Sequence, residues 1–143
     1  MRVLGLLVFI CSCAPRVAVS DAPPALVLGT FADDYGSTYE ITERTWDHDG
    51  YARYHIVRWR PDAGYLVARN DDANPTDGGR WTRIDWVRLD GMAPYVWAFC
   101  LSAYDAPTAA AAEATRTAQP NTPRTGCGGH PFSRMRRTAP DGP

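Results

Sequence analysis

The chain has 143 residues, a formal net charge of -1, 45% hydrophobic residues and 11% aromatic residues. This composition is globular, which excludes a wholly disordered chain, and the near-neutral charge gives no field that would attract nucleic acid. With its two ends set aside, about 100 residues remain, which is enough for one domain with a modest core.

The first residues have the features of an export signal. Arg2 precedes an apolar run at 3–10, which is too short to cross a bilayer core of about 30 Å as a helix but suits a signal peptide. The next residues, Ile10-Cys11-Ser12-Cys13, resemble the lipobox of bacterial lipoproteins, in which the cysteine is acylated and becomes the first residue. The resemblance implies a signal peptide at 1–12, lipidation of Cys13 and a tether at 13–24.

Lipidation would determine where the protein is found. Several acyl chains, at about 0.8 kcal/mol per buried methylene, hold a soluble domain firmly to a membrane. Ala14, and not aspartate, follows the cysteine, so the lipoprotein resemblance implies the outer membrane more than the inner one. The alternative is ordinary secretion with cleavage after Ser20, because small residues also precede that position.

Turn signals recur regularly from residue 25 onward, and each contains Gly, Asp, Asn or Pro. The runs between them are short and rich in Val, Ile, Thr, Tyr and Trp, as in strands. Sequential hairpins predict an all-β, antiparallel up-and-down meander that forms a curled sheet or a small barrel. The six expected strands lie near 26–32, 37–46, 51–60, 64–70, 80–90 and 94–104.

A C-terminal helix is expected after the sixth strand. Asp105 is a suitable N-cap, Pro107 fits the first turn, and the alanines that follow are strong helix formers, which predicts a helix over 107–118. The β domain then covers 25–132. Residues 133–143 are rich in arginine and are expected to form a disordered tail.

Two cysteines remain in the predicted mature domain, Cys100 and Cys127. An even pair in an exported protein predicts a disulfide, which for a loop of this size contributes roughly 3.5 kcal/mol in the chain-entropy estimate. The alternative is a redox or metal-binding pair of thiols. No CxxC motif supports that alternative.

The sequence gives only weak candidates for metal binding or catalysis. The three histidines lack the spacing of a zinc motif, no GxSxG motif is present, and we expect no cofactor and no enzyme activity. A glycan hydrolase is a rival hypothesis, with Asp85 and either Glu40 or Glu43 as its two carboxylates. Calcium is a second weak possibility, since one loop carries oxygen side chains at Asn70, Asp72, Asn74 and Asp77.

The aromatic residues are the strongest indication of a binding function. Flat aromatic faces beside charged groups suit sugar rings, peptides or aromatic ligands. The alternative is that these residues form the core. The candidate ligand-binding residues are Trp59, Trp81, Trp86, Trp97, Arg83 and Asp85.

Two resemblances extend these expectations. The order of Arg83-Ile84-Asp85-Trp86, Phe99-Cys100 and Thr125-Gly126-Cys127-Gly128-Gly129-His130-Pro131-Phe132 is similar to that in uncharacterised predicted lipoproteins of Gram-negative bacteria, which supports the lipid anchor and the disulfide. Gly29-Thr30-Phe31 before a meander resembles the opening of calycin barrels, lipocalins and avidins, whose signature is Gly-x-Trp. Phe31 stands in place of that tryptophan, and a six-stranded barrel would be filled by its own side chains.

We therefore expect a membrane-anchored, non-catalytic binding or envelope-interaction module. Its expected partners are the membrane, through the lipid anchor, and a glycan, a peptide or a small apolar ligand, but not nucleic acid. One rival is a calycin-like carrier, which requires an interior cavity. The other is the glycan hydrolase, which requires two carboxylates that converge in a cleft.

Overall fold

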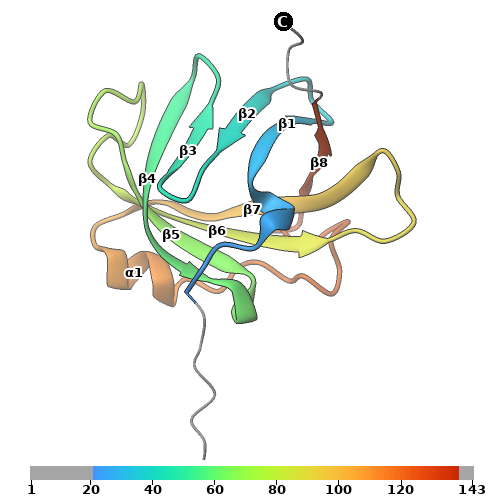
Figure 1. Ribbon diagram of the computed structural model, residues 1–143. Helices are drawn as coiled ribbons and strands as arrows, with labels where there is room; N and C mark the ends of the chain where they lie inside the picture. The colour runs from blue at the N-terminus through green and yellow to red at the C-terminus, as the bar shows by residue number, and fades with distance from the viewer. Residues whose placement is uncertain (1–20, 139–143) are drawn as a thin grey trace, which may run out of the picture.

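A computed structural model describes residues 21–138 of the chain (Figure 1). The predicted signal peptide (1–12), the lipidation site Cys13 and the tether up to residue 20 lie outside the described residues. Within the described part, eight antiparallel strands close into one barrel in sequence order. The strands are β1 (Gly29–Asp33), β2 (Thr38–Ile41), β3 (Thr45–His48), β4 (Ala52–Arg60), β5 (Tyr65–Asn70), β6 (Trp81–Arg88), β7 (Tyr95–Ala106) and β8 (Ser133–Arg137), with 3-10 turns η1 (Ala25–Val27) and η2 (Pro61–Ala63) and helix α1 (Ala109–Ala114).

The all-β meander is confirmed, but six strands is wrong because the predicted strand at 37–46 is in fact two. β2 and β3 are joined by a turn built on Thr42, whose hydroxyl oxygen accepts hydrogen bonds from the backbone N–H groups of Arg44 (3.2 Å) and Thr45 (3.0 Å). A threonine hydroxyl can organise a turn in this way without Gly, Pro, Asn or Asp. The sequence therefore shows no break at this point.

The eighth strand was missed because the tail prediction was wrong over residues 133–137. β8 pairs with β7 on one side and with β1 on the other, which closes the barrel. Met135 is fully buried in the barrel, while Arg136 and Arg137 are exposed. Only one side chain of this strand is needed inside, so its arginine-rich sequence resembles a solvated end. Closure leaves no unpaired strand edge in the sheet.

The helix is shorter than predicted and does not end the chain, because β8 follows it. β7 continues to Ala106 and stays paired with β6 through two register shifts, so the expected cap at Asp105 lies within a strand. Thr108 is the N-cap, and its side chain accepts a hydrogen bond from the Ala111 backbone N–H at 3.1 Å. Pairing with β6 thus prevails over the local preference of these residues for a helix.

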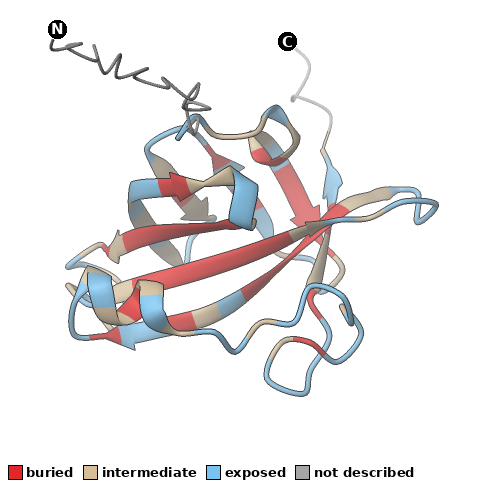
Figure 2. Ribbon diagram, turned by 90° about the horizontal axis from the view of Figure 1, so that it is seen from below, coloured by how far each residue is buried: buried red, intermediate tan, exposed pale blue. Residues whose placement is uncertain are grey.

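Aromatic side chains fill the inside of the barrel. Trp97 lies edge-on to Phe31 (5.1 Å between ring centroids) and to Trp46 (5.8 Å), and Trp46 lies edge-on to Phe99 (5.1 Å). Edge-to-face packing of this kind stabilises aromatic clusters. Figure 2 shows buried residues along the central strands. The core consists of Val27, Phe31, Tyr39, Ile41, Trp46, Trp59, Leu66, Ala68, Ile84, Trp86, Trp97, Phe99 and Met135.

Arg137 fixes the N-terminal turn η1 against the barrel. Its guanidinium donates hydrogen bonds to the carbonyl oxygens of Ala25 (3.0 Å), Leu26 (3.3 Å) and Leu28 (3.0 Å), and it lies 4.9 Å from the centre of the Phe31 ring. Gly29 has φ +120°, and a Cβ there would approach Arg137 Nη1 to 2.9 Å. The glycine is therefore required by both the backbone conformation and this close contact.

Replacing Arg137 by alanine should lower the free energy of unfolding by about 1–2 kcal/mol, because a charged donor to three carbonyl oxygens is lost. Urea unfolding at pH 7 measures this change. Arg136→Ala is the matched control, since Arg136 is also exposed on β8 but, within residues 21–138, has no hydrogen bond or ion pair to η1. Equal effects of the two substitutions would show that Arg137 does not hold η1.

The segment after β7 forms a second layer on the outer face of β5, β6 and β7. α1 packs there with Ala112 fully buried, and the predicted disulfide between Cys100 and Cys127 is confirmed, with a Cα–Cα distance of 5.5 Å. Phe132 packs beside the disulfide. In the described part of the chain, no helix has the length and apolarity needed to cross a membrane.

Candidate functional site

The tryptophans proposed as a binding face lie mostly inside the barrel. The exposed fractions of Trp59, Trp86 and Trp97 are 6%, 8% and 0%. Trp59 also donates its indole N–H to the Glu43 carbonyl oxygen at 2.8 Å. Trp81 is half-buried on the outer face, where it packs with the residues around α1. These four side chains are thus part of the packing and do not form an exposed aromatic surface.

Arg83 and Asp85 form a buried ion pair beneath α1. The guanidinium of Arg83 donates from Nε (2.9 Å) and Nη2 (2.8 Å) to the two carboxylate oxygens of Asp85, and both side chains are 5% exposed. Arg83 Nη1 donates to the Glu113 carbonyl oxygen at 2.6 Å, and its guanidinium lies 3.8 Å from the centre of the Tyr65 ring. The pair therefore joins β6 to the C-terminal end of the helix.

The Glu113 side chain completes this attachment. Its carboxylate accepts hydrogen bonds from the Tyr65 hydroxyl at 2.9 Å and from Arg58, and it also forms an ion pair with Arg60. Burial opposes ionisation of Glu113, but the hydrogen bond from Tyr65 and the charge of Arg58 outweigh it and hold the pKa below its usual value. Every charge in the cluster has a partner, so the cluster is a structural attachment of α1.

The candidate calcium ligands make separate contacts. Asn70 is buried and donates its amide to the carbonyl oxygens of Asp77 (2.9 Å) and Tyr104 (2.8 Å). The Asn74 amide pairs with the backbone N–H and C=O of Arg53, and the Asp72 carboxylate pairs with Arg69 at 2.7 Å. Across residues 21–138, no group of three or more His, Cys, Asp or Glu side chains is placed to hold a metal ion.

The carboxylates proposed for a hydrolase are not brought together. Asp85 is paired under α1, whereas Glu40 is exposed on β2, directly opposite Asp47 of β3. Glu43 is exposed in the turn between β2 and β3. Two carboxylates that flank one glycosidic bond need to lie about 5–10 Å apart in one cleft, so this arrangement does not support that chemistry.

An aromatic cluster around His48 was not predicted from the sequence. His48 stacks on Tyr39, with ring centroids 4.6 Å apart, and contacts Tyr51 at 5.0 Å. The Tyr39 hydroxyl donates to the buried Asp33 carboxylate at 2.8 Å. Burial lowers the pKa of His48, and the charges of Asp33 and Asp49 oppose that change only in part.

This lowered pKa predicts a loss of stability in mild acid. The folded protein binds a proton at His48 only at a lower pH than the unfolded chain, which does so near pH 6.5, so the free energy of unfolding falls as the pH drops below that value. Chemical unfolding at pH 7.5 and pH 5.0 measures the difference. His48→Gln should show a smaller loss between the two pH values than the wild type. The same loss in both proteins would contradict the assignment.

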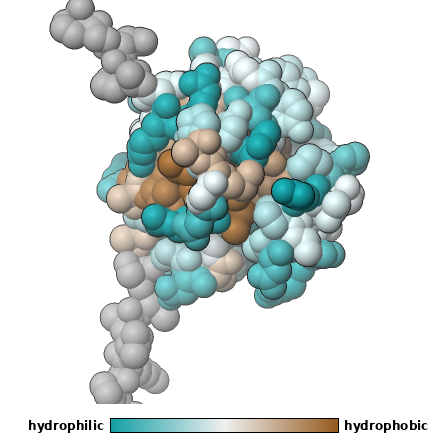
Figure 3. Space-filling model, turned by 90° about the vertical axis from the view of Figure 1, so that its right-hand side faces the viewer, coloured by the Kyte–Doolittle hydropathy of each residue, from teal (hydrophilic) through white to brown (hydrophobic). Residues whose placement is uncertain are grey.

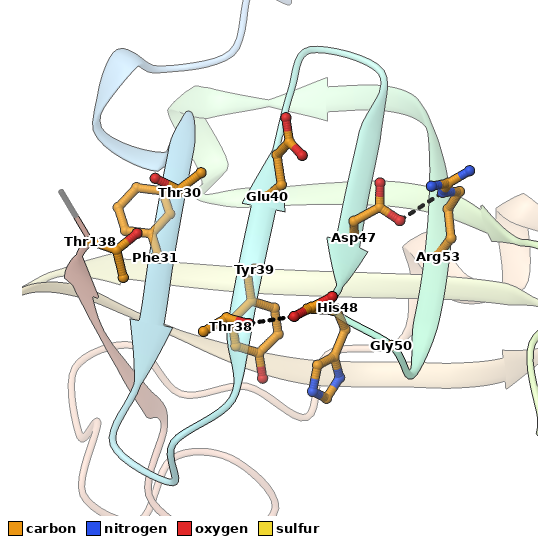
Figure 4. A pocket seen from close by; sticks show the side chains of 11 residues that line it. Thr30, Phe31, Thr38, Tyr39, Glu40, Asp47, His48, Gly50, Arg53 and Thr138 are labelled. Atoms are coloured by element: carbon orange, nitrogen blue, oxygen red, sulfur yellow. Dashed lines mark hydrogen bonds and ion pairs between the residues drawn. The ribbon is translucent and has the colours of Figure 1, made fainter. Parts of the chain in front are cut away.

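A polar groove of about 620 Å³ lies along the outside of β1 to β4 (Figure 4). Thr30, Glu40, Asp47 and Arg53 form a row across these four strands, in register. Asp47 is paired with Arg53 at 2.6 Å. Its lining residues Phe31 and Tyr39 are buried and His48 is half-buried, so the groove presents mainly hydroxyl and charged groups.

A second, more apolar groove lies beside the hairpin that joins β6 to β7, and we call it the hairpin groove. The hairpin turns at Gly91, which has φ +67°, and Leu89 and Met92 flank the turn. Figure 3 shows hydrophobic side chains near the centre of this face of the molecule, with hydrophilic residues around them. The groove has a volume of about 490 Å³ and is lined by Asp34, Tyr35, Leu89, Met92, Ala98, Pro123, Arg124, Pro131, Phe132 and Arg134.

Four segments that are distant in the sequence build the hairpin groove. Ala98 and the buried Phe132 lie at its base, beside the Cys100–Cys127 disulfide. The Phe132 backbone N–H donates to the Pro123 carbonyl oxygen at 2.8 Å, which holds the loop that forms one wall. Met92, from the hairpin, also lines the groove. The sequence contained one signal of this site, since apolar Leu89 and Met92 beside an Asp-Gly turn are unusual in a solvated hairpin.

Comparison with protein-family models, with curated proteins and with solved structures found no significant match. The architecture is nevertheless compatible with calycin-like barrels, since it is a closed, eight-stranded, antiparallel meander.

Proposed function

We propose that this protein is an exported, lipid-anchored, non-catalytic module that binds a partner through the hairpin groove on the outside of its barrel. The observation that carries the proposal is the contrast between the inside and the outside of the barrel. Trp46, Trp97 and Phe31, each at most 1% exposed, occupy the interior, whereas the hairpin groove is an apolar hollow open at the surface. Surface hollows with an apolar base and a few polar groups are the usual sites of recognition.

The lipid anchor is proposed from the sequence Ile10-Cys11-Ser12-Cys13. Cys13→Ser should abolish acylation and move the protein from the membrane fraction to the soluble fraction of its native cells. Immunoblots of the two fractions measure this change. A Cys13→Ser variant that stays with the membrane would contradict the proposed anchor, and Cys11→Ser serves as the control because acylation is expected at the second cysteine.

Binding through the hairpin groove can be tested by photocrosslinking in those cells. The photoreactive residue p-benzoylphenylalanine would replace Met92 in the groove or Val57 on β4, which are 37% and 56% exposed. The proposal predicts a specific crosslinked product from position 92 and none from position 57. Products from both positions, or from neither, would contradict it.

A second candidate function, a carrier of a small apolar ligand, is favoured by one observation. Leu101 pairs with the buried Ile84 and so faces the inside of the barrel, yet it is 37% exposed, and the nearby Tyr104 is 54% exposed. One end of the barrel thus presents apolar groups to solvent. Crosslinking from position 101 to a small molecule, without crosslinking from position 92, would favour this function over the first.

A further inference from the structure

The charges around the hairpin groove indicate what kind of partner fits it, if the proposed function holds. Arg134 is paired with Asp34 at 2.8 Å, and its guanidinium lies over the Tyr95 ring at 4.5 Å. Arg124 also lines the groove, is exposed, and has no ion pair or side-chain hydrogen bond within residues 21–138. The charged residues that line the groove are Arg124, Arg134 and Asp34, so the rim carries one uncompensated positive charge. This charge lies beside the apolar base formed by Ala98 and Phe132.

We propose that the hairpin groove binds an extended peptide segment in which an apolar side chain is followed by an aspartate or glutamate. The apolar side chain packs on Phe132 and Ala98, against Met92, whose flexible thioether adapts to different shapes. The carboxylate pairs with Arg124, because a guanidinium presents two parallel donors to a carboxylate.

The form of the groove favours a peptide over an acyl chain. Its walls are a β-hairpin and a proline-containing loop held by the disulfide, and Tyr35, which is 71% exposed, lies at its edge. These walls form an open groove of about 490 Å³, which leaves the backbone of an extended segment in water while one or two side chains are buried. An acyl chain has no carboxylate for Arg124, so it would leave the positive charge of the rim uncompensated.

The test uses the full chain in detergent and a panel of fluorescein-labelled seven-residue peptides of glycine and serine with a variable central pair. The pairs are Leu-Asp, Leu-Asn, Leu-Lys and Ser-Asp, and fluorescence anisotropy gives each Kd. We expect Leu-Asp to bind at least tenfold more tightly than the other three. Arg124→Glu should weaken Leu-Asp binding at least tenfold and should improve Leu-Lys binding.

Two matched variants control for non-specific charge effects. Arg116→Glu makes the same charge change at another exposed arginine, outside the groove, and should leave every Kd unchanged. Met92→Asp should abolish Leu-Asp binding, whereas Val57→Asp should not. Both Met92 and Val57 are exposed, so none of these variants removes a core side chain.

Equal binding of all four peptides, or weakening by Arg116→Glu as large as by Arg124→Glu, would overturn the peptide assignment. Binding to phosphatidylglycerol vesicles that is lost in Arg124→Glu, without binding of Leu-Asp, would overturn it in favour of a membrane surface. In either case a crosslinked product that still forms from position 92 would leave the proposed function standing, so the two failures can be distinguished.

Discussion

Replacing Arg83 alone is expected to destabilise the protein more than replacing Arg83 and Asp85 together. Arg83→Leu removes the cation but leaves the Asp85 carboxylate buried, and among the described residues the Ser102 hydroxyl is then its one remaining side-chain donor. An uncompensated buried charge of this kind costs about 3–5 kcal/mol. Urea unfolding at pH 7 should therefore show a large fall in the free energy of unfolding for the single variant.

The double variant Arg83→Leu/Asp85→Leu is the control for this result. Replacing both partners of a buried pair by apolar side chains of similar size is often close to neutral. We expect it to recover most of the stability that the single variant loses, although the hydrogen bond from Arg83 to the Glu113 carbonyl is also lost. If the double variant were as unstable as the single one, the ion pair would not be the main reason for the effect.

Removing the disulfide should have the second large effect. Cys100→Ala/Cys127→Ala should lower the free energy of unfolding by roughly 3.5 kcal/mol, since the unfolded chain regains the freedom of a loop with a sequence separation of 27 residues. For a domain of this size, that loss lowers Tm by roughly 10–20 °C. Thermal unfolding followed by circular dichroism measures it.

The disulfide variant also tests how the hairpin groove is built. Cys127 holds the loop that includes Pro123 and Phe132, so the groove should lose its wall and crosslinking from position 92 should fall sharply. Treating the wild type with dithiothreitol should give the same result as the double substitution. A change in stability of less than about 1 kcal/mol would show that other contacts hold the loop in place.

The sequence predicted those parts of the fold that depend on local patterns. Asp90-Gly91 marked the β6–β7 hairpin, because a tight turn at this position requires a positive φ. The pairing of Cys100 with Cys127 could also be predicted, because no other cysteines were expected in the mature domain. These features depend on residues whose chemistry alone restricts the backbone or forms a bond.

The features that the sequence did not predict depend on tertiary contacts. β8 has a single buried side chain, Met135, and becomes a strand only because β7 and β1 both offer it unpaired edges. The function of Arg83 and Asp85 could not be assigned from their strand pattern, which fits either an exposed binding pair or a buried one. Only the position of α1 above β6 decides between these, and no pattern in the sequence fixes where a short alanine-rich helix packs.

The lipid anchor, the disulfide and the filled barrel can be tested together by native mass spectrometry of the protein released from its own membrane in mild detergent without reductant. We expect a chain that begins at Cys13 with acyl groups attached, two hydrogens lighter than the reduced chain, and without a bound small molecule, because aromatic side chains fill the barrel. A small apolar molecule bound in a one-to-one ratio would contradict the filled interior and would favour the carrier.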